Sequence, residues 1–350
     1  MNTKKNKAYY RYLKNNEKFI PIGESVESMP PGFYQPVYDS YKNSAYFVEK
    51  NVIMPNLYVL SNDVQKNIID DIHNFWESEE RYKKFGSVYK RNILMYSTPG
   101  NGKTSLINIV CKQLLEEQKG VVILIDSTSD LSAYNKCMDR LRDIEPTRKV
   151  ITVIEDFERL TKDDHFASML LQLLDGNKQY DNVVTIATTN YPSILEKRFV
   201  CRPSRFNLII EFPKPNETIR REYFQKKLSD GGVDINDEKV KADIERYVEA
   251  SDGYTFDFVK ELIQGIYVDG LAEDIVIKRL EDIKEKNGKY TIEDDSPRRI
   301  GLGSARTMMN PLRTRGYDEE YDDEDDYEED GGIPEYDEGP TPDEDEYPRW

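Results

Sequence analysis

Residues 97–104 read Ser-Thr-Pro-Gly-Asn-Gly-Lys-Thr and directly follow the apolar run Asn92-Ile93-Leu94-Met95-Tyr96. A strand, then a glycine-rich turn, then a helix that begins at Lys103 is the arrangement that binds the phosphates of a nucleotide. Gly100 and Gly102 can adopt backbone conformations closed to other residues, so consecutive N–H groups can point at phosphate oxygens. This stretch therefore predicts a nucleotide-binding site.

In this phosphate loop, residues 97–104, we expect Lys103 to meet the β and γ phosphates of ATP and Thr104 to supply a hydroxyl ligand to Mg²⁺. One position departs from the usual pattern, because Ser97 stands where a glycine is normally found. Taken alone, the segment also fits an ordinary strand-to-helix turn. The residues predicted to contact the nucleotide are Pro99, Gly100, Asn101, Gly102, Lys103, Thr104 and Ser105.

The charge of the chain is concentrated at its end. The net charge is -17, and residues 316–350 hold 18 acidic residues and one basic residue. The other 315 residues are balanced, with 48 acidic and 48 basic residues. Binding to nucleic acid is disfavoured, because phosphate contacts need clustered Lys and Arg.

Cysteine and histidine are too scarce and too scattered for a disulfide framework or a zinc site. The chain has three cysteines, Cys111, Cys137 and Cys201, and two histidines, His73 and His165. No run approaches the ~18 apolar residues of a membrane span, and no signal-peptide pattern follows the basic start. We therefore expect a cytoplasmic protein with no membrane partner; a bacterial or phage-infected cytoplasm would suit the abundance of Lys, Asn, Ile and Tyr.

Short apolar runs alternate with helical patterns through the middle of the chain, which predicts an α/β fold with a parallel sheet covered on both faces. A helix is expected from a cap at Ser61 to the break at Gly86. The other expected strands are residues 121–125, 150–154, 183–187 and 208–212, with helices at 131–141 and 166–174.

Four segments follow from these patterns. Residues 1–52 lack a steady period and are interpreted as an N-terminal adaptor segment. Residues 53–213 form the nucleotide-binding domain. Residues 214–290 are wholly helical, with helices expected at 217–228, 237–250, 255–267 and 272–286, and have the size of a lid domain. Residues 291–350 are a basic and then acidic tail whose composition cannot bury a core.

An acidic pair follows the expected strand at residues 150–154. Glu155 and Asp156 would reach the same sheet edge as the phosphate loop, because the carboxyl ends of parallel strands share one edge. By position, Glu155 is the metal-side acid and Asp156 the acid that orients or deprotonates the attacking water. The alternative is that both acids merely solvate the end of a strand.

Taken in order, these segments resemble the AAA family of ATPases over roughly residues 57–265. Residues 171–176, Leu-Gln-Leu-Leu-Asp-Gly, and 183–190, Val-Val-Thr-Ile-Ala-Thr-Thr-Asn, are similar to the segments around the family's first sensor. Residues 202–207, Arg-Pro-Ser-Arg-Phe-Asn, are similar to its arginine-finger region. The order Glu-Asp, inverted from the usual Asp-Glu, resembles the subgroup that contains the mitochondrial Rieske-protein assembly ATPase, whose membrane span has no counterpart in this sequence.

The resemblance implies a P-loop NTPase sheet domain followed by a helical lid, with Asn190 as the sensor that places the attacking water. It implies that Arg202 and Arg205 are fingers reaching the γ-phosphate of a neighbouring copy, so that hydrolysis depends on a homo-oligomeric ring, by resemblance a hexamer. Gly253 and Thr255 are expected near the nucleotide. The cofactors are then ATP and Mg²⁺, and the partner an unidentified protein substrate that is remodelled or assembled.

Two other functions stay open. The Glu-Asp order and Ser97 also suit an ATP-binding scaffold or switch with weak hydrolysis, and a DNA-directed motor or loader is disfavoured by the charge distribution. Threading of polypeptide also stays open, because residues 129–135 lack the aromatic, apolar and glycine triplet of threading members. Tyr134 is the one candidate pore aromatic there, with a helix-surface or partly buried tyrosine as the alternative.

Overall fold

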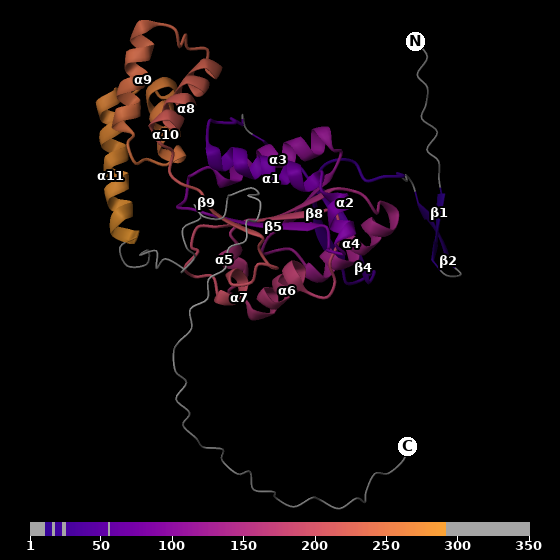
Figure 1. The fold of residues 1–350 in the computed structure, drawn as a ribbon. Helices are drawn as coiled ribbons and strands as arrows, with labels where there is room; N and C mark the ends of the chain where they lie inside the picture. The colour runs from indigo at the N-terminus through magenta and orange to yellow at the C-terminus, as the bar shows by residue number, and fades with distance from the viewer. Residues whose placement is uncertain (1–10, 16–17, 23–25, 55–56, 292–350) are drawn as a thin grey trace, which may run out of the picture. The chain divides into compact units, whose positions relative to one another are not determined.

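The computed structural model describes residues 11–15, 18–22, 26–54 and 57–291, all within the first of two units, Met1–Leu302. The predicted tail, residues 291–350, lies outside the described residues except for Thr291. The acidic segment of the tail therefore lies outside them as well. The predicted α/β fold with its parallel sheet is confirmed (Figure 1). Seven strands form one sheet in the order β4-β3-β6-β7-β8-β5-β9.

The parallel strands match the apolar runs of the sequence closely. β7 (Val150–Ile154) and β8 (Val183–Thr189) are buried along their whole length, as expected for strands covered on both faces. β5 lies between β8 and β9, so that Tyr96 pairs with Thr189 on one side and Glu211 on the other. The remaining parallel strands are β5 (Lys90–Tyr96), β6 (Val121–Ile125) and β9 (Leu208–Glu211).

The sheet extends into the segment predicted to be an adaptor. β3 (Phe33–Asp39) and β4 (Ser44–Lys50) form an antiparallel hairpin, and β3 also pairs in parallel with β6 through Phe33 and Tyr34. Pro36 lies just beyond that parallel pairing and has no N–H to donate to a ladder. The sequence pattern of β3 was therefore obscured, because the strand contains a proline and because its buried residues do not alternate with exposed ones. β1 (Arg11–Asn15) and β2 (Lys18–Ile22) form a separate hairpin.

Helices cover both faces of the sheet. α1 (Asp63–Trp76) and α3 (Lys103–Glu117) lie on one face, and α5, α6 and α7 lie on the other (Figure 1). The helix α1 starts one residue later than expected: the side chain of Asn62 caps it by accepting from the N–H of Val64 at 2.9 Å, while the N–H of Ser61 donates to Glu222. The other helices of this part are α2 (Glu79–Lys84), α4 (Leu131–Ile144), α5 (Phe157–Leu160), α6 (Asp164–Asp175) and α7 (Lys197–Val200).

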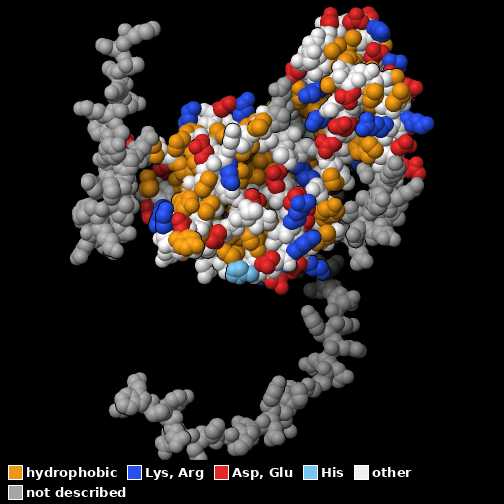
Figure 2. Space-filling model, turned by 180° about the vertical axis from the view of Figure 1, so that it is seen from behind, with side chains coloured by type: hydrophobic (Ala, Val, Ile, Leu, Met, Phe, Trp, Pro, Cys, Tyr) orange, Lys and Arg blue, Asp and Glu red, His pale blue; other side chains and the backbone are white. Residues whose placement is uncertain are grey.

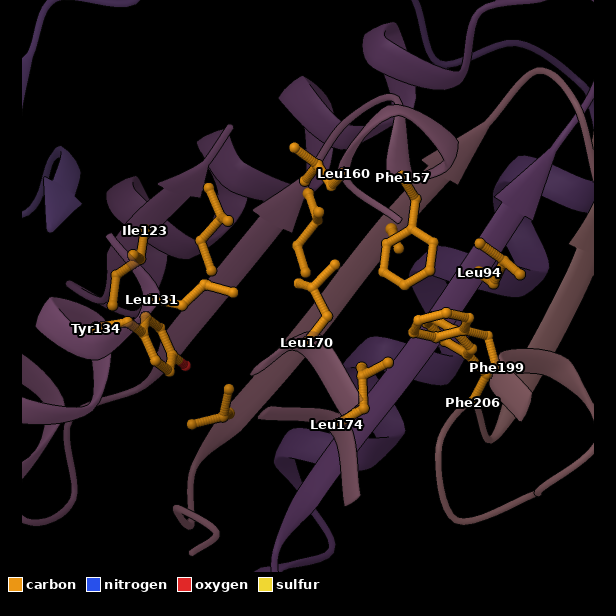
Figure 3. Close-up of a cluster of buried hydrophobic side chains, with 14 of the residues drawn as sticks. Leu94, Ile123, Leu131, Tyr134, Phe157, Leu160, Leu170, Leu174, Phe199 and Phe206 are labelled. Atoms are coloured by element: carbon orange, nitrogen blue, oxygen red, sulfur yellow. The ribbon is translucent and has the colours of Figure 1, made fainter. Parts of the chain in front are cut away.

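Two hydrophobic clusters pack on the two faces of the sheet. One joins the inner sides of α1 and α3 to the strands, with Trp76, Leu106 and Phe212 among its members. The other joins α4, α5, α6 and α7 to the opposite face, where Phe157 meets Phe199 and Phe206 edge to face (Figure 3). The short helix α5 is thereby fixed directly after the strand that carries the acidic pair.

The predicted lid is helical and has a core of its own. Phe224, Ile244, Val259 and Leu280 are buried together in that core. Asn216 caps the first lid helix, as expected, by accepting from the N–H of Ile219 at 2.9 Å. The helices are α8 (Glu217–Asp230), α9 (Glu238–Ala250), α10 (Phe256–Ile263), a π-helical turn (Gln264–Val268) and α11 (Glu273–Thr291).

Charges of both signs are interspersed on the face of the molecule shown in Figure 2. On this face Lys and Arg side chains lie among Asp and Glu side chains, with hydrophobic side chains scattered between them. This mixture agrees with the balance of 48 acidic and 48 basic residues outside the C-terminal 35 residues.

Candidate functional site

The phosphate loop connects β5 to α3 in the conformation that its glycines allow. Gly100 has φ +81° and Gly102, which precedes the first turn of α3, has φ +88°. A side chain at Gly100 would also collide with the lid, because its Cβ would lie 2.7 Å from Oδ2 of Asp257. Both glycines are thus required by the backbone, and the loop leaves the N-terminal N–H groups of α3 available to an anion.

Lys103 is buried, with 8% of its surface exposed, and its ammonium group is surrounded by protein oxygens. Nζ donates to Oγ of Ser97 at 2.7 Å, to the carbonyl oxygen of Ser97 at 3.3 Å and to Oδ1 of Asn190 at 2.8 Å. Burial lowers the pKa of Lys103 below its ordinary value, while the carboxylates of Glu158, Asp156 and Glu155 act in the opposite direction. These carboxylates favour the ammonium form that phosphate binding needs.

Thr104 and Glu155 meet at the start of α3 and the end of β7. Oγ1 of Thr104 donates to Oε1 of Glu155 at 2.6 Å. A hydroxyl and a carboxylate in contact are the oxygen ligands that Mg²⁺ prefers, and Mg²⁺ commonly takes only one or two such groups together with substrate phosphates. The residues present therefore fit the implied metal.

Asp156 lies beside Asn190, which accepts a hydrogen bond from Lys103. Asp156 has φ +49°, a left-handed conformation that aspartate tolerates, and so precedes α5 at a sharp turn. Nδ2 of Asn190 donates to Oδ1 of Asp156 at 3.4 Å, a long hydrogen bond, and Nε of Arg159 lies 3.5 Å from Oδ2 of Asp156. The structure thus brings Lys103, Asn190 and Asp156 into one polar chain at the carboxyl edge of the sheet.

The first turn of α10 contacts the phosphate loop. The N–H of Asp257 donates to the carbonyl oxygen of Gly100 at 3.3 Å, and the ring of Phe256 lies 3.5 Å from the position of a Cβ at Gly102. Phe256 is in turn buried with Leu60 and Ile219.

The two lid residues predicted to lie near the nucleotide behave differently. Oγ1 of Thr255 comes within 2.9 Å of a Cβ built at Gly100, so this residue reaches the loop. The carbonyl of Gly253 accepts from Nζ of Lys214 at 3.1 Å, and a Cβ at Gly253 would meet only Lys284. The structure thus brings Thr255, and not Gly253, against the phosphate loop.

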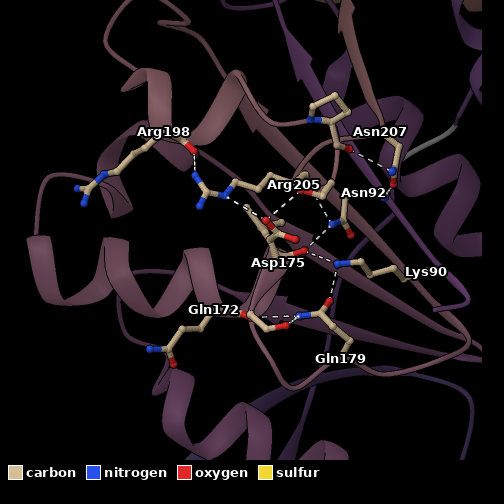
Figure 4. A network of polar contacts seen from close by, with 12 residues as sticks. Lys90, Asn92, Gln172, Asp175, Gln179, Arg198, Arg205 and Asn207 are labelled. Carbon is tan, nitrogen blue, oxygen red and sulfur yellow. Dashed lines mark hydrogen bonds and ion pairs between the residues drawn. The ribbon is translucent and has the colours of Figure 1, made fainter. Parts of the chain in front are cut away.

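The two predicted finger arginines are in different environments. Arg205 is 9% exposed; its guanidinium donates to the carbonyl oxygen of Arg198, and Nε lies 3.6 Å from Oδ2 of Asp175 (Figure 4). Its own carbonyl accepts from Nδ2 of Asn92 at 2.8 Å. Arg202 is exposed, and among the described residues no ion pair of its side chain is found. Arg205 is therefore anchored within its own chain, and Arg202 is the one whose side chain is accessible.

Tyr134 belongs to the core. It is 2% exposed and its hydroxyl lies 3.1 Å from Oγ1 of Thr152 on β7. The structure therefore agrees better with a buried tyrosine than with a pore aromatic. Tyr134 is more deeply buried than the predicted alternative of a partly buried tyrosine.

Three features of the site were not anticipated from the sequence. The hydroxyl of Ser97 binds Lys103, the carboxylate of Asp257 occupies the space that a side chain at Gly100 would need, and Glu158 is 3% exposed, with no hydrogen-bond partner for its Oε2 among the described residues. The serine was noted only as a departure from a glycine pattern. A hydroxyl six residues before the lysine was the available signal.

Two searches of the described residues gave negative results. No cluster of three or more His, Cys, Asp or Glu side chains able to hold a metal ion is found within residues 26–54 and 57–285. In the described part of the chain, none of the helices combines the length and the apolar character needed to cross a membrane.

Comparison with known proteins places this site in a family. Residues 93–214 match the family described as "ATPase family associated with various cellular activities (AAA)". The chain is 27% identical over 182 residues to "Probable mitochondrial chaperone BCS1-A" of Dictyostelium discoideum, covering 47% of this chain and 42% of that protein. It is 30% identical over 166 residues to "Mitochondrial chaperone BCS1" of Danio rerio, covering 43% of this chain and 38% of that protein.

A third relative has a name that indicates a different role. The chain is 29% identical over 191 residues to "Proteasome-activating nucleotidase" of Methanothermobacter thermautotrophicus, covering 50% of this chain and 44% of that protein. The chain thus spans less than half the length of each of these three relatives. The family resemblance inferred from the motifs is confirmed, and residues 93–214 of this chain form a domain of the AAA ATPase family.

Proposed function

We propose that the chain binds Mg·ATP and hydrolyses it as one subunit of a homo-oligomeric ring, and that turnover drives remodelling or assembly of a protein partner. The observation that carries this proposal is the convergence of Lys103, Thr104, Glu155, Asp156 and Asn190 at one sheet edge. Glu155 and Asp156 follow β7, Asn190 follows β8, and Lys103 and Thr104 begin α3, and strand ends and helix starts of this kind are where phosphates bind in parallel sheets.

The proposed roles of the site residues are supported by their contacts. The N–H groups of the phosphate loop and the ammonium of Lys103 bind the phosphates. Thr104 and Glu155 would hold Mg²⁺, which neutralises charge on the phosphates. Asp156 orients the attacking water and accepts its proton, while Asn190 fixes the Asp156 carboxylate through the amide nitrogen.

The ring is supported by the contrast between the two arginines. Charge that spreads over the phosphoryl oxygens in the transition state is stabilised by a planar, permanently charged guanidinium. Arg202 is exposed and suited to reach a neighbouring copy, whereas Arg205 is committed to Asp175 and Arg198. We therefore assign the finger to Arg202 and a supporting role to Arg205.

A protein partner is supported by the names of two relatives, a probable mitochondrial chaperone and a proteasome-activating nucleotidase. Both names concern proteins as partners. The balanced charge outside the C-terminal 35 residues and the mixed charges in Figure 2 disfavour a DNA-directed motor.

A second candidate function is a scaffold or switch that binds ATP and hydrolyses it slowly. The observation that favours it is Asp156 itself, since this side chain is one methylene shorter than glutamate and lies 3.5 Å from Arg159. Both constraints limit its reach toward a water molecule.

The two candidates are separated by measuring phosphate release per chain over a range of protein concentrations, with Mg²⁺ and with EDTA. A ring-dependent ATPase gives Mg²⁺-dependent turnover per chain that rises with concentration as rings assemble. A scaffold gives nucleotide binding with negligible release. Constant turnover per chain, with the mass of a monomer throughout, would contradict the ring.

Proteins that co-purify with an Asp156→Asn variant, which we expect to bind ATP without hydrolysing it, then identify the partner.

A further inference from the structure

The ammonium group of Lys103 has all three of its protons engaged by the protein. An ammonium carries three donors and no acceptor. Its acceptors are two oxygens of Ser97, at 2.7 and 3.3 Å, and Oδ1 of Asn190 at 2.8 Å. A phosphate oxygen can therefore bind this lysine only by displacing one of these bonds.

Ser97 and Asn190 follow neighbouring strands. Tyr96 is the last residue of β5 and pairs with Thr189, the last residue of β8, so the residues that come next are adjacent. The N–H of Ser97 also donates to the carbonyl oxygen of Thr189, at 3.4 Å. Lys103 thus links two strand ends that are already held together by backbone pairing. Ser97 is 7% exposed, so water competes little for its hydroxyl.

We propose that Ser97 and Asn190 form a latch that holds Lys103 in the nucleotide-free chain, and that the Ser97 hydroxyl thereby weakens nucleotide binding relative to the glycine usual at this position. This inference rests on the proposed function, because it concerns the same site. The hydroxyl bond is the shortest of the three, and hydrogen bonds to charged groups are stronger than those between neutral groups. A glycine would leave only the long carbonyl bond on this side.

The test compares the dissociation constant of a slowly hydrolysed ATP analogue, with Mg²⁺, for wild-type protein and for Ser97→Ala and Ser97→Gly. Both variants are expected to bind about tenfold to a hundredfold more tightly, as the loss of one charged hydrogen bond in the free state implies. Ser97→Thr keeps the hydroxyl and should stay near the wild-type value. Ser168→Ala, an exposed serine on α6, is the matched control and should change nothing. Unchanged or weaker binding by Ser97→Ala would overturn the latch.

Rescue by the conservative variant separates this role from a purely structural one. Ser97→Thr restores a hydroxyl acceptor to Lys103, so it should also restore the weaker binding of wild type. Tight binding by Ser97→Thr, equal to that of Ser97→Ala, would contradict the latch. If the wild-type chain binds no nucleotide at all, both the latch and the proposed function fail; if it binds and only the variants are indistinguishable, the latch alone fails.

Discussion

Lys103 donates a 2.8 Å hydrogen bond to Oδ1 of Asn190, so the phosphate loop is joined directly to the end of β8. This bond fixes the orientation of the asparagine amide, whose Nδ2 then faces Oδ1 of Asp156. One side chain thus connects Lys103, the proposed phosphate-binding group, with Asp156, the proposed base.

Asp156→Asn is expected to keep nucleotide binding within about twofold of wild type and to lower turnover by about 100-fold or more, because the amide cannot accept the proton of water. Folding should be preserved, since asparagine tolerates the left-handed φ of +49° at this position. Binding is measured by titration with a nucleotide analogue and turnover by phosphate release. Full turnover in this variant would show that another carboxylate is the base, with buried Glu158 the first to test.

Gly100→Ala is expected to destabilise the chain by more than the ~1–2 kcal/mol that a left-handed alanine costs, because its Cβ would lie 2.7 Å from the Asp257 carboxylate. Gly232→Ala is a matched control, since Gly232 has the same φ of +81° and open space around it. Unfolding in denaturant measures both variants. Equal losses would mean that the lid does not pack on the phosphate loop as described.

Arg202→Ala and Arg205→Ala should separate catalysis from stability. Removing Arg205 leaves Asp175 without its ion pair and is expected to cost about 2–3 kcal/mol of unfolding free energy. Removing the exposed Arg202 should change stability by less than about 0.5 kcal/mol and abolish turnover.

Subunit mixing tests whether the Arg202 finger acts between copies. Arg202→Ala subunits mixed with Lys103→Ala subunits should recover part of the activity, because some interfaces then pair an intact phosphate loop with an intact finger. Phosphate release by the mixture, compared with each variant alone, is the measurement. Complete failure to complement would argue against a finger supplied by a neighbour.

Tyr134→Phe is expected to cost about 1 kcal/mol, because it leaves the fully buried hydroxyl of Thr152 without the partner it has at 3.1 Å. Tyr46→Phe, on the edge strand β4 and 45% exposed, is the control and should be nearly neutral. Thermal or denaturant unfolding checks both. A neutral Tyr134→Phe would place this tyrosine at the surface and reopen its role as a pore aromatic.

The sequence was most informative where burial is uniform. The strands at residues 121–125 and 150–154 were predicted to the residue, because short continuous apolar runs between helical patterns are typical of parallel strands covered on both faces. The hairpin of β3 and β4 was not found, since β3 contains Pro36, which is rare within sheets, and its buried residues do not alternate with exposed ones. The short helices α5 and α7 were also missed, because four residues carry no period.

The site was predictable as a set of residue types and not as a set of contacts. Strand ends that share one edge place the acidic pair, Asn190 and the phosphate loop together, and this follows from topology. The anchoring of Arg205 to Asp175 and the bonds of Ser97 to Lys103 depend on side-chain directions that only the packed fold determines.

The central claim is that Lys103 binds the phosphates of a hydrolysed nucleotide. Its most direct test is Mg²⁺-dependent phosphate release by the full chain, wild type against Lys103→Ala, with analogue binding measured on the same samples. We predict measurable wild-type turnover and, in the variant, loss of turnover together with binding weakened by about 100-fold or more, because the variant loses the ammonium that would bind the phosphates. Equal turnover by the two proteins would contradict the account.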